Sequence, residues 1–275
     1  NGSRFPGIEA ERLDARAGVY FRGARVDGTV IVAQSRLGGN LECDGMVVDA
    51  PEQAIDAEGI EVRSVIIRRA RLKGAINLSG ARLEADLDCD GSTVSRPAEL
   101  EIAAADWVAV DLYKIESRGS VTVRNAEING EIRLVASYIH GDLDFTDTIL
   151  SNPGQSAVDM SRAVIKGAFF LRGSARVDGA LAMTAASIDT IHDSAECWPK
   201  HGDLLLNRCL YSAFIGGPVD AQSRLDWLSQ QHLKRLNPLE LARRVGQVLE
   251  LRGIAVHPAQ MTALAEGLKG CHTLV

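Results

Sequence analysis

A unit of eleven residues that recurs along the chain constrains the fold more than any other feature. The stretch GARVDGTVIVAQSRLGGNLECDG (residues 23–45) contains V-x-G-x-V-x-V and, eleven residues later, L-x-G-x-L-x-C. With positions numbered 0 to 10, position 0 is mostly aliphatic, position 2 is usually glycine, positions 4 and 6 are apolar, and position 9 is small. Units start at Ala15, Val26, Leu37, Glu61, Leu72, Leu83, Ser117, Ile128, Ile139, Ile165 and, with one extra residue, Val177.

The alternation of apolar and polar residues around positions 4 and 6 has the period of a strand with one buried face. Position 9 and the next position 0 form a second inward pair, and the glycine between the pairs is expected to take the backbone through a corner. Two units, about 22 residues, would close one coil. The pattern therefore predicts a mainly β fold, a right-handed, four-sided parallel β-helix. The fixed spacing and the lack of hairpin turn pairs disfavour the alternative, an antiparallel sandwich.

The period changes near residue 218, so we expect a β-helix over residues 1–217 and an α-helical segment over residues 218–275. The motif NPLE (237–240) has the cap, the first-position proline and the acidic third position of a helix start. A β-helix ends in unpaired strand edges, and a helical cap would cover them. A partner-binding or dimerising bundle is the alternative interpretation.

Composition limits the class of protein. A hydrophobic content of 46% over 275 residues is enough for a large core, and 24% charged residues argue against bulk disorder. The net charge of −6 argues against a general nucleic-acid binder. The sequence contains no apolar run of about 18 residues, so we expect no transmembrane segment. It also lacks a charged start followed by an apolar stretch, so we expect no signal peptide. The first residue, Asn1, is not Met, which suggests a missing upstream segment; five cysteines without paired spacing suggest the cytoplasm.

With these repeats, the chain resembles a bacterial family of β-helical repeat proteins related to pentapeptide-repeat solenoids, often labelled "oxidoreductase" or "membrane-associated oxidoreductase". The resemblance rests on the modules at 54–94 and 173–188 and on the closing segments ECWPKHGDLLLNRCLYSAF (196–214) and RLDWLSQQ (224–231). It covers nearly the whole chain and implies the fold rather than an activity. After Gln231 the family continues with a Pro-Tyr helix start, whereas this chain has Asn237-Pro238-Leu239.

Charged residues recur at two outward positions. Position 7 of the first unit in each triplet is Arg22, Arg68, Arg124 and Arg172, and position 7 of the third unit is Asp44, Asp90 and Thr146. Position 5 of the third units adds Glu42, Asp88 and Asp144. Because Arg22 and Asp44, like Arg68 and Asp90, are one predicted coil apart, each arginine should stack over its aspartate. A structural salt ladder is the favoured interpretation, and a binding surface with patterned charge is the alternative.

Other candidate residues lie near the predicted junction with the helical segment. His192, Cys197 and His201 have side chains that suit zinc, but their spacing matches no usual zinc motif and no fourth ligand is evident. Trp198, Tyr211 and Trp227 could pack the helices onto the solenoid or form an interaction surface. Cys43 and Cys89 share the slot of apolar residues and are expected to be buried small hydrophobes.

No motif supports an enzymatic activity. The chain has no dinucleotide fingerprint, C-x-x-C, Walker loop, G-x-S-x-G or H-E-x-x-H. We therefore expect a non-enzymatic scaffold or protein-interaction module, without cofactor, that binds a protein partner or itself. An enzyme, glycan-active or redox, with a site on the solenoid side or at the junction is one alternative, and a self-assembling structural solenoid is another.

Overall fold

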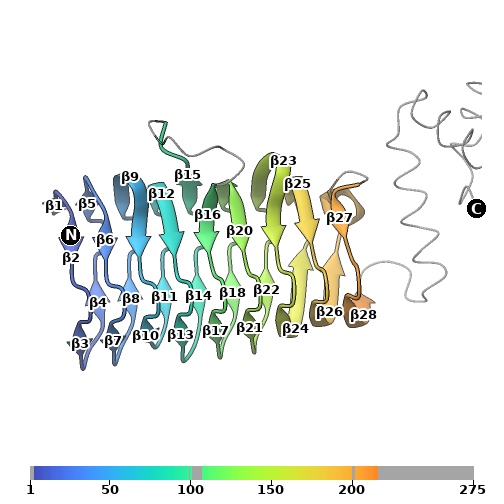
Figure 1. Cartoon of the computed structure of the whole chain (residues 1–275), viewed down its shortest axis with the longest axis horizontal. Coiled ribbons are helices and arrows are strands. Elements are labelled where there is room, and N and C mark those ends of the chain that lie inside the picture. Colours follow the sequence, from blue (N-terminus) through green and yellow to red (C-terminus); the bar gives the residue numbers. More distant parts are fainter. Residues whose placement is uncertain (1–2, 99, 101–106, 200–201, 216–275) are drawn as a thin grey trace, which may run out of the picture. The chain divides into compact units, whose positions relative to one another are not determined.

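A computed structural model describes residues 3–98, 100, 107–199 and 202–215. The chain divides into two compact units, residues 1–215 and 216–275. The described part is mainly β and forms a parallel β-solenoid of about nine turns, as predicted (Figure 1). The predicted helical segment at 218–275 lies outside the described residues.

The strands form two parallel sheets of 13 and 15 strands, and each sheet contains two columns. The first column comprises β1 (Arg4–Phe5), β5 (Arg25–Val26), β9 (Val47–Asp56), β12 (Arg71–Asn77), β15 (Thr93–Ser95), β19 (Glu127–Asn129), β23 (Ile149–Asp159) and β25 (Arg176–Ala182). The second comprises β2 (Ile8–Glu9), β6 (Val30–Ile31), the ends of β9 and β12, β16 (Val108–Asp111), β20 (Glu131–Arg133), the ends of β23 and β25, and β27 (Leu204–Leu205).

The other sheet holds the third and fourth columns. The third comprises β3 (Asp14–Ala15), β7 (Arg36–Leu37), β10 (Glu61–Val62), β13 (Arg82–Leu83), β17 (Glu116–Ser117), β21 (Tyr138–Ile139), β24 (Val164–Leu171), β26 (Ser187–Asp193) and β28 (Leu210–Ile215). The fourth comprises β4 (Val19–Tyr20), β8 (Leu41–Glu42), β11 (Val65–Ile66), β14 (Leu87–Asp88), β18 (Val121–Thr122), β22 (Leu143–Asp144) and the ends of β24, β26 and β28. A 3-10 turn, η2 (Ala195–Cys197), precedes β27.

The strand register follows the predicted coil. Val19 pairs with Leu41 and Val121 pairs with Leu143, each 22 residues apart, whereas coils that contain an insertion are longer. The segments between the predicted triplets keep this register, since Ile55 of β9 pairs with both Val30 and Ile76. The ladder is therefore continuous through the connectors.

The core is a column of aliphatic side chains, as the pattern predicts. Positions 4 and 6 are buried in every unit after the first. At four buried position 9 residues with a hydroxyl group, Ser35, Ser92, Ser137 and Thr148, the side chain donates to a main-chain oxygen of the preceding coil; Ser137 Oγ, for example, lies 2.7 Å from Leu112 O. These hydrogen bonds allow polar residues in an otherwise apolar stack.

Position 2 glycines such as Gly28 lie at a bend between two strands, as predicted, but the left-handed turn of each unit lies at another residue. Position 2 glycines such as Gly28 and Gly167 have no left-handed backbone; they are needed because the coils approach closely. A Cβ on Gly28 would lie 2.3 Å from Pro6 O, and one on Gly167 would lie 2.6 Å from Gly141 O. The left-handed residue is instead position 8: Gly23, Gln34, Gly45, Arg69, Gly80, Gly91, Asn125, Ala136, Asp147, Gly173 and Ala185.

Several left-handed corners carry side chains that oppose this conformation. Ala136 has φ 57° and no side-chain hydrogen-bonding group to offset the strain. We expect Ala136→Gly to raise the free energy of unfolding by about 1 kcal/mol, measured by urea denaturation. Ala126→Gly is the control: Ala126 is buried and its φ is not positive, so this change should destabilise. Equal effects of the two variants would contradict the assignment of the corner.

Three coils contain insertions at the corner between the first and second columns. The register shifts there mark residues 50–52 and 152–155 as additional to the regular coil, and a longer stretch of chain separates β15, which ends at Ser95, from β16, which begins at Val108. In the following coil, each insertion meets a glycine whose φ lies between 121° and 132°: Gly74, Gly130 and Gly179. A Cβ on Gly130 would lie 2.3 Å from Cδ1 of the buried Trp107 ring. These glycines have the left-handed backbone that position 2 otherwise lacks.

Candidate functional site

The four position-7 arginines, called here the arginine ladder, lie with the predicted acids on the fourth strand column. The residues predicted to stack, Arg22 with Asp44 and Arg68 with Asp90, lie in adjacent coils. The residue that follows each arginine donates to the main-chain oxygen of the aspartate: Gly23 N to Asp44 O at 2.7 Å and Arg69 N to Asp90 O at 2.8 Å. The side chains, however, do not pair as predicted. Arg68 Nη2 bonds Asp44 Oδ2 of the preceding coil at 2.8 Å, whereas Arg68 Nε lies 3.8 Å from Asp88 Oδ2.

The pairing of the other arginines explains why Arg68 bonds Asp44 and not Asp90. Arg124 pairs with Asp90 of the preceding coil at 2.5 Å, and its main-chain N–H donates to Asp90 Oδ1 at 2.9 Å. Asp90 is thereby turned away from Arg68. Arg22, in the first coil, pairs with Glu42. Each acid is mostly shielded whereas the arginine side chains are 42–54% exposed, so the pairs stabilise the fold only modestly.

Arg172 has a different environment. Its Nε lies 3.4 Å from Thr146 Oγ1, and its guanidinium lies 4.5 Å from the centre of the Phe170 ring. Phe170 also contacts the His192 ring, with centroids 4.6 Å apart. This end of the ladder therefore has an aromatic surface in place of acids.

A second charged surface, which the sequence reasoning missed, lies along the third strand column. Its outward residues form two rows, one on each side of the buried position 0. The alternating row comprises Asp14, Arg36, Glu61, Arg82 and Glu116. The basic row comprises Arg16, Arg63, Arg118, His140 and Lys166. The signal was available, because these residues flank the inward position 0 of the units; only Glu61 and Arg63 are shifted by one place, since Val62 takes the inward place in that coil.

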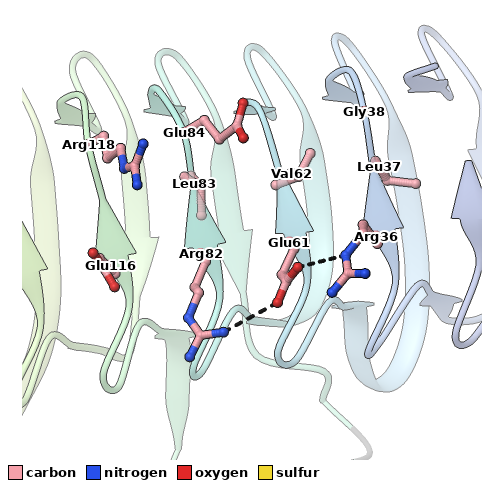
Figure 2. A pocket seen from close by; sticks show the side chains of 10 residues that line it. All are labelled: Arg36, Leu37, Gly38, Glu61, Val62, Arg82, Leu83, Glu84, Glu116 and Arg118. Carbon is pink, nitrogen blue, oxygen red and sulfur yellow. Dashed lines mark hydrogen bonds and ion pairs between the residues drawn. The ribbon is translucent and has the colours of Figure 1, made fainter. Parts of the chain in front are cut away.

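The alternating row is internally paired. Glu61 accepts hydrogen bonds from Arg36 at 2.8 Å and from Arg82 at 3.3 Å (Figure 2). The bond from Arg36 is the main reason why the pKa of Glu61 lies below its usual value. The acids of this row therefore have partners within it or face solvent.

A shallow groove of about 420 Å³ runs between the two rows. Gly38 leaves a gap in one wall, and Arg118 extends from the same wall without a drawn partner (Figure 2). Glu84, from the neighbouring coil, extends toward the strand that carries Val62 rather than toward Arg118. The groove is open and has charged side chains along both sides, so it suits an extended polar chain better than an apolar small molecule.

The proposed metal ligands do not come together among the described residues. His192 stacks on Phe170, whereas the Cys197 thiol is buried and lies 3.6 Å from Gly173 O. Burial raises the pKa of Cys197, which disfavours the thiolate that a metal requires. His201 lies outside the described residues, and within them no three His, Cys, Asp or Glu residues form a metal-binding group.

The aromatic candidates differ in exposure. Trp198 is only 6% exposed, and its Nε1 donates to Asp193 Oδ2 at 2.5 Å, so it offers little surface to a partner. Tyr211 is 47% exposed and contacts Phe214 with ring centroids 4.5 Å apart. Trp227 lies outside the described residues.

Two buried cysteines occupy the core as expected. Cys43 and Cys89 are free thiols in position 6. Burial raises the pKa of Cys43 to about 12 and raises that of Cys89 as well. A neutral, enclosed thiol is a poor nucleophile, so neither residue is suited to redox chemistry.

No protein-family model matches the chain, and no curated protein matches it. Within the described residues, no helix is long and apolar enough to cross a membrane. The function must therefore be argued from the surfaces.

Proposed function

We propose that the protein is a non-enzymatic β-helical scaffold that binds a protein partner along its side. The observation that carries this proposal is the set of outward charged rows that continue from coil to coil in constant register. Strands in such a ladder lie about 4.8 Å apart, so the rows form a long, rigid surface with a fixed charge pattern. Electrostatic patterns of this kind favour selective association with a complementary surface.

The same proposal includes three further points. The chain is related to pentapeptide-repeat solenoids, its coil is right-handed and four-sided, and the protein is cytoplasmic. The eleven-residue repeat and the 22-residue register support the first two. Within the part of the chain that the structure describes, Cys43, Cys89 and Cys197 are free, buried thiols, which supports a reducing compartment.

We also propose that residues 218–275 form helices that cap the last coil. Leu210, Tyr211 and Ile215 of β28 are 67%, 47% and 44% exposed, an apolar surface that favours a cover. A chain ending after Ile215 should self-associate in light scattering and melt about 5 °C lower than the whole chain. The whole chain should have a helical far-ultraviolet signal that the shortened one lacks.

A matched control separates loss of the cap from general damage. In the shortened chain, Leu210→Ser together with Ile215→Ser should restore the monomer, because both changes remove exposed apolar area. A shortened chain that is monomeric and equally stable would contradict the cap.

The scaffold proposal is tested by native mass spectrometry of the protein purified at low salt from its own cells, compared with its denatured mass. We expect the chain mass alone or the chain with a protein partner. An extra mass that matches a flavin, a nicotinamide nucleotide or a metal would contradict the scaffold and favour an enzyme. A series of regular multiples of the chain mass would favour the self-assembling solenoid.

A further inference from the structure

The basic row differs from the other charged surfaces because its cations are unpaired. Arg16, Arg63, Arg118, His140 and Lys166 are all exposed. Among the described residues, no ion pair joins the arginines or the lysine of this row to a carboxylate. By contrast, Arg22, Arg68 and Arg124 of the arginine ladder each have an acidic partner.

Register places these residues in one line along the solenoid. Val62 pairs with Leu83, and Ser117 pairs with both Leu83 and Ile139, so the residues that follow them stand side by side in successive coils. Six coil-to-coil steps separate Arg16 from Lys166. At about 4.8 Å per step the row extends roughly 30 Å, a distance that an extended peptide of about nine residues can follow.

The row also has neighbours that restrict its ligand. Gly38 and Glu84 interrupt the cations, and the groove beside the row is bordered by Glu61 and Glu116. A phosphate backbone, which is uniformly negative, would meet these carboxylates at close range. A peptide can instead place acids opposite the cations and neutral or basic residues opposite Glu84 and Glu116.

Aromatic stacking gives a second reason to favour a peptide. Single-stranded nucleic acid is usually held by exposed aromatic rings on which the bases stack. The tyrosine ring beside this row, that of Tyr138, already contacts the His140 ring at 4.8 Å and lies 5.9 Å from Lys166 Nζ. The surface thus offers charge without an open stacking platform.

We propose that the basic row and the adjoining groove form a docking site for an extended acidic peptide segment of a partner protein. This inference rests on the proposed scaffold function and names the part of the partner that the scaffold would recognise. Arg118 occupies the central place, because it belongs to the row and also lines the groove (Figure 2).

The test measures fluorescence anisotropy of a labelled peptide of about twelve residues that repeats Glu-Ser-Gly, titrated with the whole protein at low ionic strength. We expect saturable binding that the same peptide with Gln in place of Glu does not show. In the triple variant Arg63→Gln, Arg118→Gln, Lys166→Gln, binding should weaken at least about tenfold.

A charge-matched variant is the control. Arg12, Arg69 and Arg162 are exposed arginines at left-handed corners outside the row, and their triple change to Gln removes the same three charges. This variant should bind within about twofold of the unchanged protein. Equal losses in both variants would show nonspecific attraction and overturn the docking site.

Two further outcomes would also overturn it. One is tighter binding of a labelled oligothymidylate that the row variant abolishes, since this would assign the row to nucleic acid. The other is no saturable binding of the acidic peptide. If native mass spectrometry retains a protein partner while the peptide fails to bind, the docking site is wrong and the scaffold proposal stands.

Discussion

Replacing Gly130 with alanine should destabilise the solenoid by about 4 kcal/mol, the largest effect we expect from adding one methyl group. Two costs combine at this position. The backbone φ of 125° is one that side chains rarely adopt, and the new Cβ would lie 2.3 Å from Cδ1 of Trp107. Trp107 cannot easily move, because it is 4% exposed and its Nε1 donates to Asn129 O at 2.9 Å. Chemical denaturation followed by circular dichroism measures the change.

Gly80→Ala separates backbone strain from steric overlap. Gly80 has φ 66°, and a Cβ there would meet no atom within 4 Å. This variant should lose only about 1 kcal/mol, which is the cost of the left-handed conformation alone. If Gly130→Ala cost no more than Gly80→Ala, the packing of Trp107 against the following coil would be wrong.

Removing the Phe145 ring should cost about 3 to 5 kcal/mol. Phe145 is 1% exposed and meets Phe169 of the next coil edge to face, with ring centroids 5.9 Å apart. Phe145→Ala would leave a cavity inside a stack whose backbone is held by hydrogen bonds on both sides, so little relaxation is expected. Thermal unfolding by calorimetry measures the loss.

Phe170→Ala is the matched control, because Phe170 is adjacent to Phe169 but faces outward. Its ring contacts His192 and Arg172 at the surface. We expect a loss of less than about 1 kcal/mol. A double variant of Phe145 and Phe169 that shows no coupling would contradict the edge-to-face contact.

The repeat predicted the fold in detail at those positions where a residue type serves a single purpose, such as an aliphatic side chain that fills the core. Val30 and Leu41 are buried because alternation defines an inward face, and the 22-residue register follows from counting. The bend at Gly28 was predicted, but its physical reason was not, because glycine has two uses: Gly28 makes room for the neighbouring coil, whereas Gly23 supplies a left-handed turn. Sequence spacing alone does not separate these uses.

The charged surfaces were predicted only in part for a related reason. Counting placed Arg68 and Asp90 in adjacent coils, yet the acid that Arg68 bonds is Asp44. That choice depends on how Arg124 holds Asp90. The basic row was missed because its residues occupy ordinary outward positions of the repeat. Whether these cations form ion pairs depends on the directions of side chains in several coils.

The insertions at a single corner have a consequence for engineering. Residues 50–52 and 152–155 are additional to the regular coil and lie within β9 and β23, at the same corner, while the ladder on either side keeps its register. The body thus tolerates extra chain there, provided that the next coil supplies a glycine such as Gly74 or Gly179. A foreign peptide grafted at this corner of successive coils would be displayed in parallel copies, at spacings set by the number of coils between them.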